Sequence, residues 1–464
     1  MAGSVYPPRS RAAYEPVGDD LEAQDGAREA ADEGLAWQHP QARKSRRWDW
    51  RTGLAGLLAG VVLGAGAVHT TGRVRAANEP AKAADDLVLL PSASISSPSN
   101  ASDALSVPVR IHYRGENGLN GRDAILPPDC PVGVVYTSDE NSADVVVLNS
   151  DSHQSISVEE LEERNRKRPW QKHAIWGVEA APNRQSLESH FHRLRDGKRN
   201  ETVEYEMTYR LNSTVPATYS YGYFNYDNPP LPVQQKRSDK IAAAFISNCN
   251  PKNARTLLLD ELSALLPGKI DSFGSCRNNA NTAETLREMG LYDSVGEHSR
   301  WNEKITMIGH YRFTIAFENS NDLDYATEKY FQALERGSVP IVFGPPHYAA
   351  RLFPSPNAAI DVAEYLPQNY TALSTSSSTA PTSLDADAKE GLARLAKRLE
   401  HLSSEEGTQE YEEMLAWKKS SWRDDTLNPL GKIVRESTSR WAQDCRLAGV
   451  YRGQEWARSK WTEP

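Results

Sequence analysis

The chain has 464 residues, a formal net charge of −9 and a pI near 5.8. This acidic balance argues against a nucleic-acid partner, because phosphate backbones are bound by basic surfaces. The length is sufficient for two or three domains, and a hydrophobic content of 39% indicates that part of the chain is tail or linker.

The N-terminal part has the pattern of a membrane anchor. Residues 1–50 show no apolar period and predict a disordered cytosolic tail. Residues 52–72 contain no Asp, Glu, Lys or Arg, and about 20 such residues span the hydrocarbon core of a bilayer. Basic residues lie just before this segment, at Arg43, Lys44, Arg46, Arg47 and Arg51. We therefore predict a transmembrane signal anchor at 52–72 with the remainder luminal; a glycine-rich linker is the alternative.

The segment after the anchor is rich in Ser, Ala and Pro. Residues 73–105 therefore predict a flexible stem. Sequons of the form Asn-x-Ser/Thr occur only beyond the apolar segment, at Asn100, Asn200, Asn212 and Asn369. These candidate N-glycosylation sites agree with a luminal body.

Short β-branched runs then alternate with polar segments. The runs are VPVRIHY, VGVVYTS, ADVVVLN and HAIWGVE, and SVEELEERNRKR between the last two predicts a charged surface helix capped by Ser157. Alternating strands and helices predict a parallel sheet covered by helices. We assign residues 106–228 to this first lobe.

A second lobe, at residues 236–385, has the same alternation. The predicted strands are IAAAFIS, IDSFG, YRFTIAF and SVPIVFG, and the predicted helices are NARTLLLDELSALLP and ATEKYFQALERG. Leucines mark one side of the first helix, at Leu257, Leu258, Leu262, Leu265 and Leu266. Successive strand–helix–strand units predict a Rossmann-type α/β fold. Residues 369–387 predict a low-complexity surface insertion, and 386–464 a C-terminal helical region.

Polar residues follow two predicted strands of the second lobe, at the end where parallel sheets bind ligands. In FENSNDLDYATEK, Glu328 and Lys329 fall in the first turn of a helix, where unpaired N–H groups attract phosphate. Arg255 falls at the other helix start. Two cations at two strand ends predict a nucleotide-diphosphate site, whereas solvated surface pairs are the alternative. Neither GxGxxG nor GxxxxGK[ST] is present there, so a dehydrogenase or P-loop protein lacks its fingerprint.

These residues bring out a family resemblance. FENSNDLDYATEKYFQALERGSVPIVFG resembles the donor-binding signature of the α-(1,3)-fucosyltransferases, glycosyltransferase family 10. AAAFISNCNPKNAR and IDSFGSCRNN are similar to segments of the plant-type branch, which fucosylates the innermost GlcNAc of N-glycans. The resemblance covers residues 107–370 and is stronger in the second lobe than in the first.

The resemblance implies a GT-B fold with an acceptor-side lobe followed by a GDP-fucose-binding lobe. It implies that Arg255 and Lys329 hold the pyrophosphate and that Glu328 holds the ribose. Asn319 and Tyr325 would shape the donor pocket.

Two further residues receive roles by position. Arg277, after the IDSFG strand, is a guanosine-side candidate. Glu179 ends the predicted strand HAIWGVE and is the candidate general base, which takes the proton of the acceptor hydroxyl. The alternative for Glu179 is a solvent-exposed strand-end glutamate. A single attack from the opposite face would convert β-L-fucose to an α-linkage.

No metal ligand is predicted. Asp322 and Asp324 form the D-x-D that ligates Mn²⁺ in many glycosyltransferases, but here Arg and Lys already neutralise the diphosphate. No cofactor is required by the motif, and stimulation by Mn²⁺ or Mg²⁺ stays open. Cys249 and Cys276 both follow strands and are a candidate disulfide, with free thiols as the alternative. The resemblance offers no partner for Cys445.

The anchor pattern predicts a single-pass type II protein. The resemblance implies a Golgi enzyme that transfers fucose from GDP-fucose to an N-glycan or glycoprotein acceptor, with linkage to O3 of the innermost GlcNAc. Two alternatives stay open: a peripheral LacNAc-type GlcNAc as acceptor, and a non-catalytic luminal carbohydrate-binding protein on the same scaffold. A homodimer is also left open.

Overall fold

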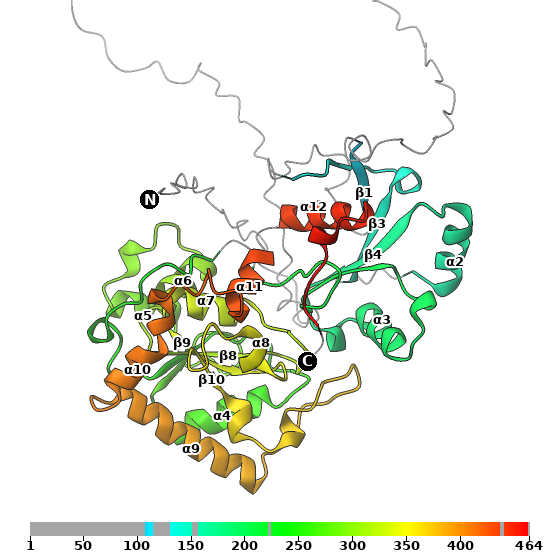
Figure 1. The fold of residues 1–464 in the computed structure, drawn as a ribbon. Coiled ribbons are helices and arrows are strands. Elements are labelled where there is room, and N and C mark those ends of the chain that lie inside the picture. The colour runs from blue at the N-terminus through cyan, green and yellow to red at the C-terminus, as the bar shows by residue number, and fades with distance from the viewer. Residues whose placement is uncertain (1–106, 115–129, 151–155, 221–223, 437–439, 463–464) are drawn as a thin grey trace, which may run out of the picture. The chain divides into compact units, whose positions relative to one another are not determined.

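A computed structural model describes residues 107–114, 130–150, 156–220, 224–436 and 440–462 (Figure 1). The predicted tail, the anchor at 52–72, the stem and Asn100 lie outside the described residues. In the described part, no helix is long and apolar enough to cross a membrane. That part contains two five-stranded sheets, and all the pairings in both are parallel.

The first sheet has the strand order β2-β1-β3-β4-β5. Its strands are β1 (Val109–Arg114), β2 (Val134–Tyr136), β3 (Val145–Asn149), β4 (Lys172–Gly177) and β5 (Tyr205–Thr208). The helices α2 (Val158–Lys167) and α3 (Gln185–Arg195) connect β3 to β4 and β4 to β5. Every residue of β3 is buried, as expected for a central parallel strand covered on both faces.

The predicted strands and helix of this sheet are confirmed. The side chain of Ser157 accepts a hydrogen bond from the Glu160 amide at 3.1 Å and caps α2 as predicted. The strand β5 was not predicted, because YEMT is too short and too polar to show an apolar period.

The second sheet has the order β10-β9-β8-β6-β7. Its strands are β6 (Ala242–Ala244), β7 (Ile270–Ser272), β8 (Phe313–Phe317), β9 (Val339–Phe343) and β10 (Ile360–Asp361). The helices of this part are α4 (Arg255–Leu265), α5 (Thr282–Glu288), α6 (Arg300–Ile308), α7 (Glu328–Arg336) and α8 (Tyr348–Leu352). The predicted strand–helix–strand units are therefore confirmed.

The core of the second lobe lies between its sheet and helices α4 and α9 (Ala386–Ser403). The buried face of α4 differs slightly from the predicted one: it consists of Leu258, Leu259 and Leu262, whereas Leu257 is only partly buried. Helix α9 packs against α4, and Leu259 belongs to the same hydrophobic cluster as the buried leucines of α9.

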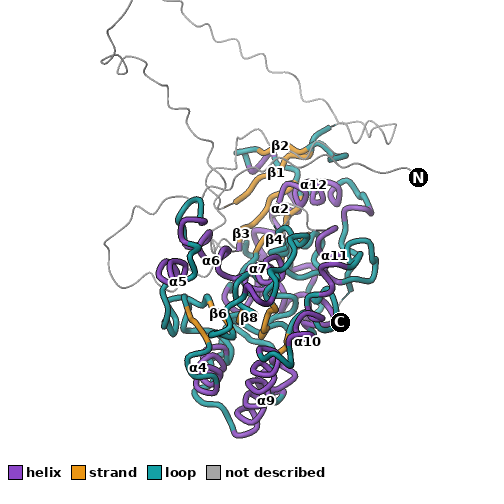
Figure 2. Tube along the Cα trace, turned by 90° about the vertical axis from the view of Figure 1, so that its left-hand side faces the viewer, coloured by secondary structure: helices purple, strands orange, loops and turns teal. Residues whose placement is uncertain are grey.

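The C-terminal helices do not form a single block. After α9 come α10 (Thr408–Met414), α11 (Pro429–Glu436) and α12 (Arg440–Tyr451). Helices α9 and α10 pack with the second sheet, whereas α12 lies beside β1 and β2 of the first sheet (Figures 1 and 2). The hydroxyls of Tyr113 and Tyr136 both donate to the carboxylate of Asp444 in α12. The chain thus returns to the first lobe at its end.

Short 3-10 turns join these elements, at Glu140–Ser142, Ala181–Asn183, Arg199–Glu201, Val233–Gln235, Tyr292–Ser294, Val362–Tyr365, Gln368–Tyr370, Ala416–Lys419 and Glu455–Ala457. The turn Ala181–Asn183, η5, follows β4 and carries part of the site described below.

The cysteines form two disulfides. The predicted pair Cys249–Cys276 is present. Cys130 and Cys445 also pair, across a sequence separation of 315, so free thiols are wrong for all four cysteines. The second disulfide could not be predicted, because it depends on the return of α12 to the first sheet.

Gly391 in α9 provides a test of this packing. A Cβ at this position would lie 1.7 Å from the backbone oxygen of Tyr365. Alanine normally stabilises a helix by about 1 kcal/mol relative to glycine, but overpacking against backbone costs about 1–3 kcal/mol. We expect Gly391→Ala to lower the free energy of unfolding in urea titrations. Gly296→Ala, where a Cβ meets nothing within 4 Å, is the control and should be close to neutral. A stabilised Gly391→Ala variant would show that α9 packs differently.

Candidate active site

The polar segment between β8 and α7, residues 318–327, is called the β8–α7 loop. Thr327 caps α7, and its hydroxyl accepts a hydrogen bond from the Lys329 amide. Glu328 and Lys329 fall in the first helical turn, as predicted, and the helix ends at Gly337 in the left-handed conformation. The loop is therefore followed by a properly capped helix whose amino end faces the site.

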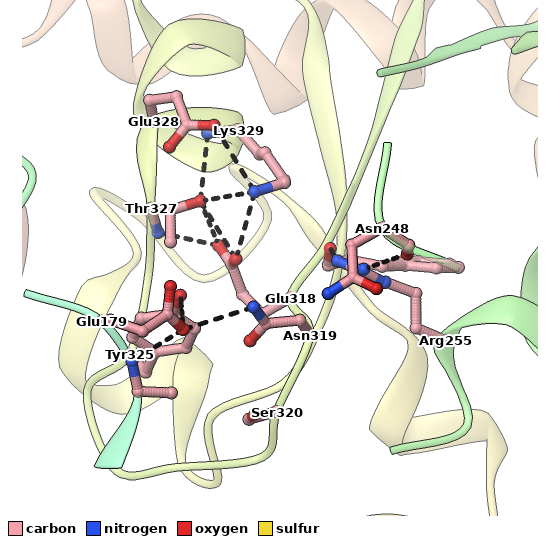
Figure 3. Close-up of polar contacts among 12 residues, drawn as sticks. Glu179, Asn248, Arg255, Glu318, Asn319, Ser320, Tyr325, Thr327, Glu328 and Lys329 are labelled. Carbon is pink, nitrogen blue, oxygen red and sulfur yellow. Dashed lines mark hydrogen bonds and ion pairs between the residues drawn. The ribbon is translucent and has the colours of Figure 1, made fainter. Parts of the chain in front are cut away.

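Glu318 lies inside this loop, below Thr327 and above Ser320 in the view of Figure 3. Its side chain is fully buried and accepts hydrogen bonds from the Thr327 amide at 2.7 Å and the Thr327 hydroxyl at 2.9 Å. Burial raises the pKa of Glu318 to about 7, and the nearby Lys329 ammonium opposes this increase. Gly344 permits the close approach of the loop, because a Cβ there would lie 2.9 Å from Cβ of Glu318.

A cation cluster lies beside Glu318. The ammonium of Lys329 is 3.8 Å from Oε2 of Glu318 and 3.4 Å from Oε1 of Glu328. Lys304 on α6 contributes a second ammonium, 3.9 Å from the same Glu328 oxygen. Lys304 was missed, since nothing in its helix RWNEKITMI marks that residue. The two predicted residues, Glu328 and Lys329, are thus in contact through their side chains.

Arg255 is the first residue of α4 and is fully buried. Its guanidinium donates to the backbone oxygens of Asn248 at 2.6 Å and Phe317 at 3.4 Å. Asn253 donates to the backbone oxygen of Glu318 at 3.0 Å. The start of α4 is thus joined to the end of β8, and Figure 3 shows Lys329 above Glu318 and Arg255 to its right.

Glu179 lies two residues beyond β4 and is only 4% exposed. The solvent-exposed alternative is therefore wrong. Its Oε1 accepts hydrogen bonds from the hydroxyl of Tyr325 at 2.9 Å and from the amide of Asn319 at 3.3 Å. The same oxygen accepts from Asn183 at 2.9 Å and from the Ala180 amide at 3.0 Å. The candidate base Glu179 is thus hydrogen-bonded to Asn319 and Tyr325, the two residues predicted to shape the pocket for the sugar nucleotide.

The two carboxylates of the D-x-D pattern, Asp322 and Asp324, form hydrogen bonds and ion pairs with other parts of the chain. Asp322 accepts from the hydroxyl of Tyr209 and from Arg210 at 2.9 Å. Asp324 forms an ion pair with Arg351, at 2.8 Å, and accepts from the Leu211 amide at 2.9 Å. Both carboxylates therefore attach the β8–α7 loop to neighbouring segments, the one at residues 209–211 and the helix α8. Among the described residues there is no group of three or more His, Cys, Asp or Glu side chains suited to a metal.

The predicted surface insertion also contacts the β8–α7 loop. The Ser374 amide donates to the backbone oxygen of Asn321 at 2.8 Å, and the Asn321 amide donates to the Ser374 hydroxyl at 2.9 Å. The next turn reaches α3, where the Ser376 amide donates to Glu188 at 2.7 Å. Low sequence complexity gave no sign of these contacts.

The remaining candidates have other surroundings. Arg277 forms an ion pair with Asp260 of α4, and its side chain is 51% exposed, so its role on the guanosine side stays a prediction. Asn369 is exposed and Asn212 is partly buried, whereas the side chain of Asn200 lies outside the described residues.

A family model matches the part of the chain that contains this loop. Residues 234–377 match the model of glycosyltransferase family 10 (fucosyltransferase), C-terminal part. The matched segment includes Arg255, the β8–α7 loop and α7.

Individual relatives match over limited lengths. A fucosyltransferase-like protein of Arabidopsis thaliana is 43% identical over 143 residues, which are 30% of this chain and 23% of that protein. GDP-fucose protein O-fucosyltransferase 3 of Gallus gallus is 30% identical over 203 residues, 43% of this chain and 34% of that protein. Glycoprotein 3-alpha-L-fucosyltransferase A of Drosophila melanogaster is 28% identical over 243 residues, 49% and 41% respectively. The chain spans less than half the length of each of these relatives.

The buried carboxyl of Glu318 predicts a pH dependence of stability. A carboxyl whose pKa is raised by folding contributes stability that is present below its unfolded pKa and lost as pH rises through the folded value. For Glu318 that window runs from about 4.5 to about 7. Glu318→Gln keeps an acceptor for the Thr327 amide and removes the ionisation, so its stability relative to the parent should increase across this window.

The expected increase is up to about 3 kcal/mol, since each pKa unit corresponds to about 1.4 kcal/mol. Urea titrations at pH 4.5, 6 and 8 measure it, and the lowest pH serves as an internal control. A difference between the two proteins that does not change with pH would contradict the assignment.

Proposed function

We propose that the protein is an inverting fucosyltransferase that moves L-fucose from GDP-fucose to O3 of a GlcNAc residue, with the innermost GlcNAc of N-glycans as acceptor. The observation that carries the proposal is the contact of Glu179 with Asn319 and Tyr325 in the loop that leads to Lys329. A candidate base and a cationic helix start therefore belong to one site.

The donor side of the proposal rests on charge and helix geometry. The positive end of the α7 helix dipole and the ammonium of Lys329 suit a diphosphate. Arg255 adds a guanidinium at the start of α4, a group that pairs well with phosphate oxygens. The carboxylate of Glu328 can accept hydrogen bonds from ribose hydroxyls. The match of residues 234–377 to the fucosyltransferase family model supports a fucosyl donor, and the Gallus gallus relative is named for GDP-fucose.

The transfer step needs a base and a stabilised leaving group. In the proposed step the acceptor O3 forms a bond to C1 of fucose while the bond from C1 to the phosphate oxygen breaks. GDP leaves with the electron pair, and the proton of O3 passes to Glu179. Attack opposite to the leaving group inverts the β-configuration of the donor to an α-linkage.

The acceptor is proposed on subfamily likeness. The Drosophila melanogaster relative is named for a 3-linkage on glycoproteins, whereas the Gallus gallus relative is named for transfer to protein oxygen. Both match this chain at similar identity, so it is the plant-type segments AAAFISNCNPKNAR and IDSFGSCRNN that favour the innermost GlcNAc.

The proposal includes the cellular arrangement. Residues 52–72 would anchor the protein in the Golgi membrane as a single-pass type II protein, with the catalytic part in the lumen and the two lobes in a GT-B arrangement. No metal is part of the proposed step, because the cations near Glu328 can neutralise the departing diphosphate.

A side-by-side transfer assay tests the proposal. The detergent-solubilised full chain is given GDP-fucose with two acceptors, an N-glycopeptide with an exposed core and a free LacNAc oligosaccharide. We expect fucose on O3 of the innermost GlcNAc. Glu179→Gln should lower kcat by about 10²- to 10⁴-fold, the usual contribution of a general base. Glu162→Gln, on the exposed face of α2, is the control and should retain activity.

The other outcomes are informative. Fucose on LacNAc alone would overturn the acceptor while keeping the donor. Transfer to neither acceptor by a chain whose thermal stability GDP also fails to raise would contradict fucosyl transfer and favour a non-catalytic carbohydrate-binding protein.

A further inference from the structure

Asn183 links the candidate base to the β8–α7 loop. It lies four residues after Glu179, at the end of η5. Its side-chain amide donates to Oε1 of Glu179 at 2.9 Å and is 3.3 Å from the side-chain oxygen of Asn319. The hydroxyl oxygen of Ser320 lies 3.4 Å from the same nitrogen. One side chain from the first lobe therefore contacts both Glu179 and the loop of the second.

The backbone around Asn183 is well fixed. Pro182 restricts the turn, and the Asn183 amide donates to the backbone oxygen of Ala180 at 2.9 Å. The amide of Ala181 donates to the buried hydroxyl of Tyr209 at 2.9 Å. Because this turn is held at both its backbone and its side chain, Asn183 presents its amide in a defined direction.

The chemistry of this contact suits an orienting role. A carboxamide donates through two N–H groups and does not ionise, so it remains a donor at every working pH. A hydrogen bond to a carboxylate is charge-assisted and stronger than one between neutral groups. Within the part of the chain that the structure describes, the hydrogen bonds to the carboxylate of Glu179 all reach Oε1. Oε2 is therefore the oxygen left to accept a proton.

Asn183 differs from the other side-chain donors to Glu179. Tyr325 and Asn319 come from the β8–α7 loop and have proposed roles with the donor sugar nucleotide, so a bound donor competes for them. Asn183 comes from the same short segment as Glu179. Its bond does not depend on groups that the donor would engage.

We infer that Asn183 is a positioning residue for the proposed transfer: it holds Oε1 of Glu179 so that Oε2 faces the acceptor hydroxyl. This role rests on the proposed function, because it has meaning only if Glu179 takes the acceptor proton. Asn183 itself touches neither the sugar nor the proton that is transferred.

Steady-state kinetics of the full chain with GDP-fucose and the accepted glycan test the role. Asn183→Ala should lower kcat by about 10- to 100-fold, the size of effect that a misplaced catalytic group produces. The KM for GDP-fucose and the increase in thermal stability on GDP binding should stay within about twofold of the parent. Asn183→Asp keeps the shape but loses the amide donor, so it serves as a second variant with a loss at least as large.

Asn428→Ala is the matched control. Asn428 is a buried asparagine outside the site, whereas Asn183 is partly buried. The side chain of Asn428 donates to the backbone oxygen of Pro354 and accepts from the Gly431 amide. None of these partners contacts Glu179. We expect a lower melting temperature and an unchanged kcat, which separates a structural loss from a positioning loss.

A double-mutant cycle gives the sharpest readout. If Asn183 acts through Glu179, adding Asn183→Ala to Glu179→Gln should lower kcat no further. Equal losses in both backgrounds, or a normal kcat in the single variant, would overturn the role of Asn183 while fucosyl transfer stands. A parent chain that binds GDP and transfers no fucose would instead overturn the proposed function.

Discussion

The hydrogen bond from the Tyr325 hydroxyl to Glu179 is the contact on which the proposed site depends. Glu179 follows a strand of the first sheet, and Tyr325 lies in the loop after a strand of the second. Without this contact the structure would offer a cationic helix start in one lobe and a buried carboxylate in the other. With it, the proposed base and the helix end proposed to bind phosphate belong to one hydrogen-bonded arrangement.

Several buried interactions hold the β8–α7 loop in the form that this contact requires. The carboxyl of Glu318 accepts a hydrogen bond from the amide of Thr327, which caps α7. Gly344 has no side chain and so leaves space for Glu318. Asp322 and Asp324 pair with Tyr209 and Arg351. The acidic and amide side chains of the loop are therefore used mainly in hydrogen bonds and ion pairs that fix the conformation of the loop. Most of its polarity supports the few residues that are proposed to meet the ligand.

The order of strands and helices could be predicted from the sequence, because β3, β8 and β9 are continuous apolar runs and α7 begins with a cap and ends at a glycine. Glu328 and Lys329 could be placed at a helix start for the same reason. By contrast, the partners of Asp322 and the disulfide of Cys445 depend on residues far apart in the chain. A D-x-D pattern is visible locally, whereas its pairing with Tyr209 and Arg351 is not. Asn183 was missed because an asparagine in a short turn carries no local signal.

Calorimetric titration with GDP tests most directly whether this group of residues is one nucleotide-diphosphate site. The account predicts that Lys329→Met, which removes the ammonium and keeps the length of the side chain, weakens GDP binding by at least about tenfold, since a hydrogen bond to a charged group contributes about 1.5–3 kcal/mol. Glu179→Gln should bind GDP about as well as the parent, because Glu179 is assigned to the acceptor. Equal GDP affinity in the parent and in Lys329→Met would contradict the account.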